Sequence, residues 1–90
     1  MTYIVQAIET RYLGPTNTKG GRIRARAWAG AITVPYDPAL SSEDNHRAAA
    51  MALEAKYGWA PCEHWATGCN AKGDGYVHIA LGRHMWAKPA

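Results

Sequence analysis

One alternating stretch decides the fold: Gly20-Gly21-Arg22-Ile23-Arg24-Ala25-Arg26-Ala27-Trp28-Ala29-Gly30-Ala31-Ile32-Thr33-Val34-Pro35-Tyr36. Successive side chains of a β-strand point to opposite faces, so this pattern is typical of a hairpin with one apolar face. We predict a two-residue turn at Ala29-Gly30, which pairs Ala25 with Val34. The outer face would then carry Arg22, Arg24, Arg26, Trp28 and Thr33.

Size and composition indicate a single domain over residues 1–90 with a small core. The chain has 90 residues, a hydrophobic fraction of 48%, no Phe and a net charge of +3. It contains no apolar run of the roughly 18 residues that a membrane span needs, and its first residues lack the pattern of a signal peptide. We therefore expect a cytoplasmic protein, in the host cell under the hypothesis below, with no membrane partner.

The rest of the chain predicts three further elements. Residues 3–13 favour a first strand, and a helix should follow Asp37-Pro38, capped by Ser41 or Ser42 and ended by Gly58. Its inner stripe would be His46, Ala49, Ala50, Leu53 and Tyr57. Residues 60–75 are interpreted as a long loop, residues 76–81 as a last strand, and residues 87–90 as a frayed tail.

In the last strand we expect Val77, Ile79 and Leu81 to face inward. The order strand, strand, strand, helix, strand predicts an α+β fold in which a small antiparallel sheet of about four strands packs one helix on one face. The exposed edge strands of such a sheet could pair with those of a second copy, so the sequence is compatible with a homodimer.

The outer arginines and Trp28 are the best candidate binding residues. Arginines at every second position of a strand lie about 6.6 Å apart, a spacing suited to the phosphates of an extended nucleic acid, and Trp28 could stack on a base. A docking face for acidic side chains and a merely solvated exterior are the alternatives. The candidate binding set is Lys19, Arg22, Arg24, Arg26 and Trp28.

Metal binding and catalysis have weaker support. Cys62, His64 and Cys69, with His78 or His84, could ligate zinc, but their spacing matches no familiar zinc motif. A disulfide between Cys62 and Cys69 and two free thiols are the other readings. No nucleophile, base and orienting group fall into a recognisable pattern. We therefore expect no enzyme activity, no metal and no cofactor.

Several segments resemble a family of small proteins encoded by bacterial phages, prophages and plasmids. The resemblance covers about residues 3–59 and rests on the segments Tyr12-Leu13-Gly14-Pro15-Thr16-Asn17-Thr18-Lys19-Gly20, Arg22-Ile23-Arg24-Ala25, Val34-Pro35-Tyr36-Asp37 and Ser41-Ser42-Glu43-Asp44-Asn45-His46-Arg47-Ala48-Ala49-Ala50. The family has no settled activity, so the resemblance implies a context and no residue roles. Small accessory proteins of such elements often bind and block host machinery, as anti-CRISPR proteins do.

Two functional hypotheses follow. The first is a non-enzymatic inhibitor or adaptor that binds a host protein or nucleoprotein complex in an anti-CRISPR-like manner. The second is a direct binder of DNA or RNA that uses the basic and aromatic strand face.

Overall fold

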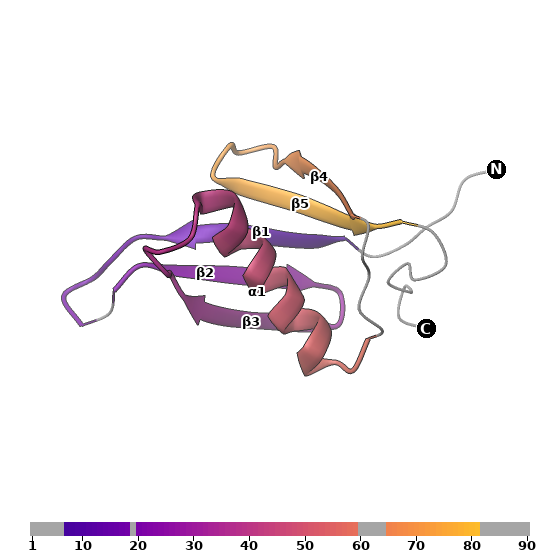
Figure 1. Cartoon of the computed structure of the whole chain (residues 1–90), viewed down its shortest axis with the longest axis horizontal. Coiled ribbons are helices and arrows are strands. Elements are labelled where there is room, and N and C mark those ends of the chain that lie inside the picture. Colours follow the sequence, from indigo (N-terminus) through magenta and orange to yellow (C-terminus); the bar gives the residue numbers. More distant parts are fainter. Residues whose placement is uncertain (1–6, 19, 60–64, 82–90) are drawn as a thin grey trace.

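The computed structural model describes residues 7–18, 20–59 and 65–81. The elements follow in the order β1 (Ile8–Leu13), β2 (Arg22–Ala27), β3 (Gly30–Pro35), α1 (Ser42–Lys56), β4 (Trp65–Cys69) and β5 (Gly75–Ala80). All strand pairs are antiparallel, and the sheet order is β3-β2-β1-β5-β4, with α1 lying across one face (Figure 1). The predicted α+β class is confirmed, with five strands in place of about four.

The core lies between α1 and the strands β1, β2, β3 and β5. Its fully buried members are Ile8, Ile23, Ala25, Ala49, Ala50, Leu53 and Ala80. Small side chains on both layers let the helix approach the sheet closely, and Leu53 fills the space that remains. The predicted inner stripe of the helix is confirmed, since His46, Ala49, Ala50 and Leu53 are buried and Tyr57 is partly buried.

The hairpin forms with its predicted faces but in a different register. Ala27 pairs with Gly30 and Ala25 with Ile32, so the turn residues are Trp28 and Ala29, one position earlier than expected. Moving the turn by one position shifts the pairing by two, and a shift of two residues keeps every side chain on its face. Gly30 has a φ of +149°, and a Cβ at this position would clash with the Tyr57 hydroxyl oxygen, so only glycine suits the site.

The helix begins and ends where the sequence predicts. The Ser41 hydroxyl accepts a hydrogen bond from the Asp44 N–H at 3.1 Å, and Gly58 has a left-handed φ of +67°. The buried Asn45 side chain ties the incoming chain to the helix, since its Oδ1 accepts from the Asp37 N–H at 2.7 Å. Its Nδ2 donates to the carbonyls of Asp37, Leu40 and Ser41. No helix in these ranges is long and apolar enough to cross a membrane.

The predicted loop over residues 60–75 is wrong in its second half. Residues Trp65–Cys69 form β4, which pairs with β5, and Asn70 and Gly75 close the hairpin through a 3.1 Å bond from the Asn70 N–H to the Gly75 carbonyl. The segment Trp-Ala-Thr-Gly-Cys has little apolar alternation because β4 is an edge strand with mostly exposed residues. Residues 60–64, the start of the predicted first strand at residues 3–6 and the predicted frayed tail at residues 87–90 lie outside the described residues.

The predicted faces of the last strand are also wrong. Tyr76, His78 and Ala80 point toward the helix, whereas Ile79 is 37% exposed and Leu81 is 48% exposed. His78 is buried because polar partners on β1 and β4 satisfy both nitrogens of its ring. The alternation of apolar residues was therefore a poor guide to which face of β5 is buried.

Candidate functional site

The face of the sheet opposite α1 carries the predicted arginine row. Arg22, Arg24 and Arg26 occupy alternate positions of β2, and Arg11 of β1 lies directly opposite Arg24. The described part of the segment 60–75 forms β4 and its hairpin at the far edge of the sheet and does not lie over β2. Arg24 and Arg26 are accordingly exposed. We call this surface, made of Arg11, Arg22, Arg24 and Arg26, the arginine face.

Two carboxylates balance part of this charge. Arg11 Nη2 lies 2.9 Å from Asp74 Oδ2, and Arg26 Nη2 lies 3.5 Å from Glu9 Oε1. A hydrogen bond from Asn70 lowers the pKa of Asp74, and Arg11 adds to the effect, so this carboxylate stays ionised. Within the described ranges Arg22 and Arg24 form no ion pair, so the centre of the arginine face keeps a net positive charge.

The other predicted binding residues lie apart from this centre. Trp28 is 62% exposed but belongs to the turn beyond the end of β2, and Lys19 lies outside the described residues. Besides the arginines, the strand positions on this face hold Glu9, Leu13, Ala31, Thr33, Pro35, Ala66, Gly68, Gly75, Val77 and Ile79. None of these described residues has an aromatic ring on which a base could stack.

A chain of polar side chains runs through the opposite, helix-covered side. The fully buried Thr10 Oγ1 lies 2.8 Å from His46 Nδ1 and 2.9 Å from His78 Nε2. His78 Nδ1 in turn lies 3.1 Å from Thr67 Oγ1. Thr10 has one hydroxyl proton, so it donates to one imidazole and accepts from the other. These hydrogen bonds form one largely buried polar chain that joins strand β1, helix α1, strand β5 and strand β4.

Both imidazoles in this chain are held neutral. Burial, and to a smaller extent the neighbouring His46, lowers the pKa of His78 to about 4. Burial likewise lowers the pKa of His46, against the effect of its hydrogen bond at Thr10. This network of hydrogen bonds is therefore largely uncharged near pH 7.

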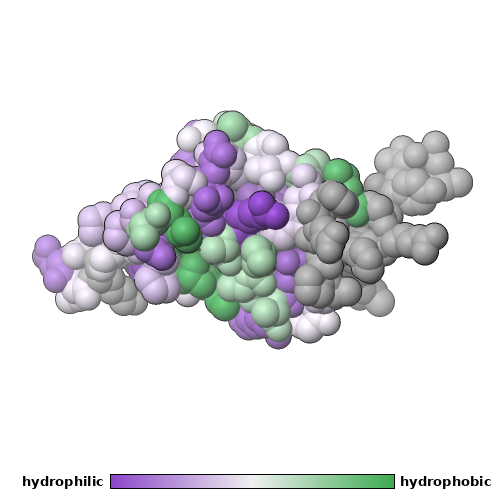
Figure 2. Space-filling view, viewed as in Figure 1, coloured by the Kyte–Doolittle hydropathy of each residue, from purple (hydrophilic) through white to green (hydrophobic). Residues whose placement is uncertain are grey.

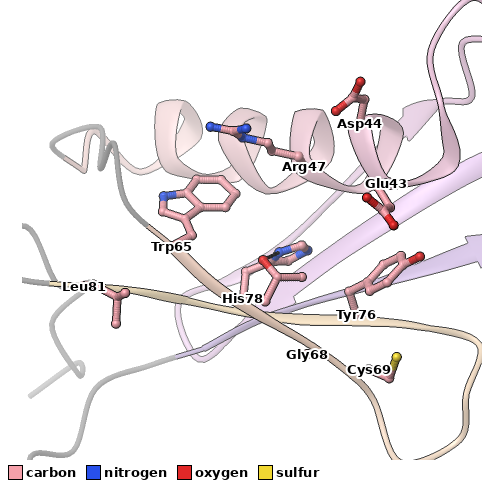
Figure 3. Close-up of a pocket in the computed structure, with 10 residues that line it drawn as sticks. Glu43, Asp44, Arg47, Trp65, Gly68, Cys69, Tyr76, His78 and Leu81 are labelled. Carbon is pink, nitrogen blue, oxygen red and sulfur yellow. Dashed lines mark hydrogen bonds between the residues drawn. The ribbon is translucent and has the colours of Figure 1, made fainter.

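A groove of about 620 Å³ opens between the first turns of α1 and the strands β4 and β5 (Figure 3). The rings of Trp65, Tyr76 and His78 line it on the sheet side, and Glu43, Asp44 and Arg47 line it on the helix side. The Arg47 guanidinium carbon lies 5.7 Å from the centre of the Trp65 ring, within range of a cation–π contact. Hydrophilic residues also gather where α1 approaches β5 in the space-filling view (Figure 2). We call this cavity the helix–β4 groove.

The sequence did not predict the helix–β4 groove, because β4 was assigned to a loop. A usable signal was the turn composition of Asn70-Ala71-Lys72-Gly73-Asp74-Gly75 directly before a strand, which is typical of a hairpin. This turn composition indicates a second strand that ends just before residue 70. The groove follows from the position of that strand at the sheet edge, beyond the span of α1.

The thiol and metal hypotheses can be followed only in part. Cys69 is an exposed free thiol, whereas Cys62, His64 and His84 lie outside the described residues. Within the parts of the chain that the structure describes, no three His, Cys, Asp or Glu side chains are grouped to hold a metal ion. His78 is already hydrogen-bonded through both ring nitrogens, which leaves it no lone pair directed at a ligand.

Comparison with known proteins adds no assignment. No protein-family model, no curated protein and no solved structure matches this chain.

Proposed function

We propose that the protein is a non-enzymatic binding protein that docks its arginine face on an acidic surface of a host protein or nucleoprotein complex. The observation that carries the proposal is the exposed centre of this face, where Arg24 lies between Arg22, Arg26 and the opposite Arg11. The exposed guanidinium group of Arg24, on a rigid sheet, suits recognition of a carboxylate or phosphate, because its planar fork binds such groups in fixed geometry.

The resemblance to proteins of phages, prophages and plasmids suggests what the binding achieves. An accessory protein of a mobile element gains from blocking host defence, so we propose an inhibitory, anti-CRISPR-like role in the host cytoplasm. The buried histidines are held in structural hydrogen bonds, since Thr10 bonds both rings and Thr67 bonds the second ring nitrogen of His78.

A direct nucleic-acid-binding role is the second candidate. The alternating arginines of β2, with Arg11 beside them, favour contacts with phosphates. The strand positions of this face that the structure describes offer no ring for base stacking, whereas single-strand binders commonly use such rings. This difference is why we place an acidic protein or nucleoprotein surface first.

The test compares two charge reversals of equal size. Arg24→Glu changes the centre of the arginine face, whereas Lys72→Glu changes an exposed cation in the β4–β5 turn. The tagged wild-type protein should recover a specific partner from host lysate and raise phage survival, Lys72→Glu should behave alike, and Arg24→Glu should lose both effects. Equal recovery and equal phage survival with the two variants would contradict the proposal.

A binding assay with a single-stranded DNA separates the second candidate. Binding through phosphates weakens with salt, with a slope of log K against log salt of about −0.7 per phosphate contact. A slope near −2 that becomes shallower in Arg24→Glu would support direct nucleic-acid binding. Absence of binding at low salt would exclude it and leave the protein partner.

A further inference from the structure

The geometry points to the outer edge of β4 as a docking site for an extended peptide that carries basic side chains, with those side chains entering the helix–β4 groove. The peptide would extend the sheet by one strand, as in other cases of β-strand addition. This site lies at the β4 edge of the sheet, separated from β2 by β1 and β5, and does not depend on the arginine face.

The backbone groups of β4 point alternately toward β5 and away from the sheet. The bond between the Asn70 N–H and the Gly75 carbonyl identifies a hydrogen-bonded pair, and such pairs alternate with non-bonded pairs in an antiparallel ladder. Because these pairs alternate along the register, the backbone groups of Ala66 and Gly68 bond to β5. The N–H and C=O groups of Thr67 and Cys69 therefore point outward, away from the sheet, and no described strand pairs with them.

The other edge of the sheet, strand β3, has outward backbone groups that are partly blocked. The same alternation, taken from the bond between the Tyr36 N–H and the Gly21 carbonyl, places the outward groups of β3 at Ala31, Thr33 and Pro35. Pro35 has no N–H, and the Ala31 carbonyl accepts a 2.8 Å hydrogen bond from Lys56 Nζ. Edge strands are commonly blocked by prolines and lysines in this way. In β4, residues Trp65–Cys69 include neither a proline nor a charged residue, and the register has no bulge.

The helix–β4 groove lies beside the outer edge of β4. Trp65, Thr67 and Cys69 project on the helix side, where they border the groove of about 620 Å³. This volume falls within the range of about 300–1,000 Å³ typical of ligand sites. Every second side chain of an added strand would therefore enter the helix–β4 groove.

The charges of the groove select the side chain. Glu43 and Asp44 supply two exposed carboxylates, and Figure 3 shows the Glu43 carboxylate on the side of α1 that faces the strands. The cation of the groove, Arg47, already lies over Trp65. An ammonium or guanidinium group would meet an acidic rim and the faces of aromatic rings, which together favour cations.

The opposite side of the added strand would meet small and apolar residues. Ala66 and Gly68 of β4 point to the open face, next to Ile79 and Val77 of β5. A peptide that alternates lysine with valine satisfies both sides at once. We therefore choose acetyl-Val-Lys-Val-Lys-Val-amide as the probe and the same peptide with glutamate in place of lysine as its control.

The test is a titration of the ¹⁵N-labelled full chain, under reducing conditions, followed by NMR. We expect the lysine peptide to bind and to shift the outward amides of Thr67 and Cys69 more than the inward amides of Ala66 and Gly68. Cys69→Pro removes an outward N–H without removing a bond to β5, and should weaken binding by about two- to tenfold. Cys69→Ser keeps this N–H and should bind as the wild type does.

Further variants separate the peptide site from its alternatives. Glu43→Lys should weaken the lysine peptide, whereas Glu43→Gln should have a smaller effect, and Arg24→Glu on the arginine face should have none. No binding at millimolar peptide, equal binding of the glutamate peptide, or unchanged binding in Cys69→Pro would overturn the inference. Sedimentation of the free chain as a dimer that Cys69→Pro dissociates would also overturn it, because the occupant of the edge would be a second copy.

Discussion

Replacing Thr10 with valine should expose the energetic role of the buried polar chain. Valine has nearly the shape of threonine, so the substitution removes the hydroxyl and leaves the packing of β1 against α1 in place. Thr10 is 0% exposed, and its Oγ1 lies within 3 Å of both His46 Nδ1 and His78 Nε2. The variant therefore leaves a nitrogen of each imidazole without its partner, in a region that water does not reach.

The expected magnitude follows from this geometry. A buried polar group left without a hydrogen bond costs about 1–3 kcal/mol, and Thr10→Val creates two such groups. Partial relaxation of the two rings reduces the sum, so we expect a loss of about 2–4 kcal/mol in the free energy of unfolding. In a domain of this size the melting temperature should fall by about 10–25 °C.

The assay is urea denaturation at pH 7.5, followed by circular dichroism, with Thr10→Ser as the matched control. Serine keeps the oxygen and loses only a methyl group, at a cost of about 1 kcal/mol. The reasoning is refuted if Thr10→Val is as stable as Thr10→Ser. That outcome would mean that the hydrogen bonds to the two histidines contribute no net stability.

Three further predictions concern the pH dependence of stability, the turn at Gly30 and the buried side chain of Asn45. The pKa of His78 is about 4 in the folded chain and about 6.5 when unfolded, so the unfolded state binds more protons between these values. The contribution of neutral His78 to the free energy of unfolding should be fully present above pH 6.5 and should fall by about 3 kcal/mol as the pH drops to 4. A free energy of unfolding that stays constant between these pH values would contradict this prediction. Gly30→Ala should lower the free energy of unfolding by at least about 2 kcal/mol. In a double-mutant cycle Tyr57→Phe should recover part of this loss, because it removes the oxygen with which the new Cβ clashes. Fully additive effects of the two substitutions would show that this clash is not the cause. Asn45→Ala should cost about 2–4 kcal/mol, since it removes the side chain that bonds both the N–H and the carbonyl of Asp37. Asn45→Asp, which keeps the acceptor alone, should lie between Asn45→Ala and the wild type in thermal denaturation. An Asn45→Asp variant as stable as the wild type would show that the donated bonds are unimportant.

The sequence predicted those features that depend on neighbours along the chain. The caps of α1 at Ser41 and Gly58 come from local backbone chemistry, and the inner stripe of α1 comes from its 3.6-residue period. The positions of the arginines on one face follow from the period of two, which survived an error of two residues in the hairpin register. These signals are local, so a sequence read in order contains them.

The candidate site was predictable only in part. The arginine row of β2 was found, but its neighbour Arg11 and its partners Glu9 and Asp74 were not, because they come from two other parts of the chain. The helix–β4 groove was missed entirely, since an exposed edge strand needs no apolar alternation.

For this protein the sequence alone determined an amphipathic helix and a hairpin with a basic face, because periodicity and capping act over a few residues. Only the tertiary structure decided that His78, and not Ile79, is buried on β5. A histidine is buried when distant residues satisfy its ring nitrogens, and here Thr10 and Thr67 do so from two different strands. The same long-range arrangement placed β4 at the edge of the sheet and opened the groove beside α1, a position that the sequence of β4 does not encode.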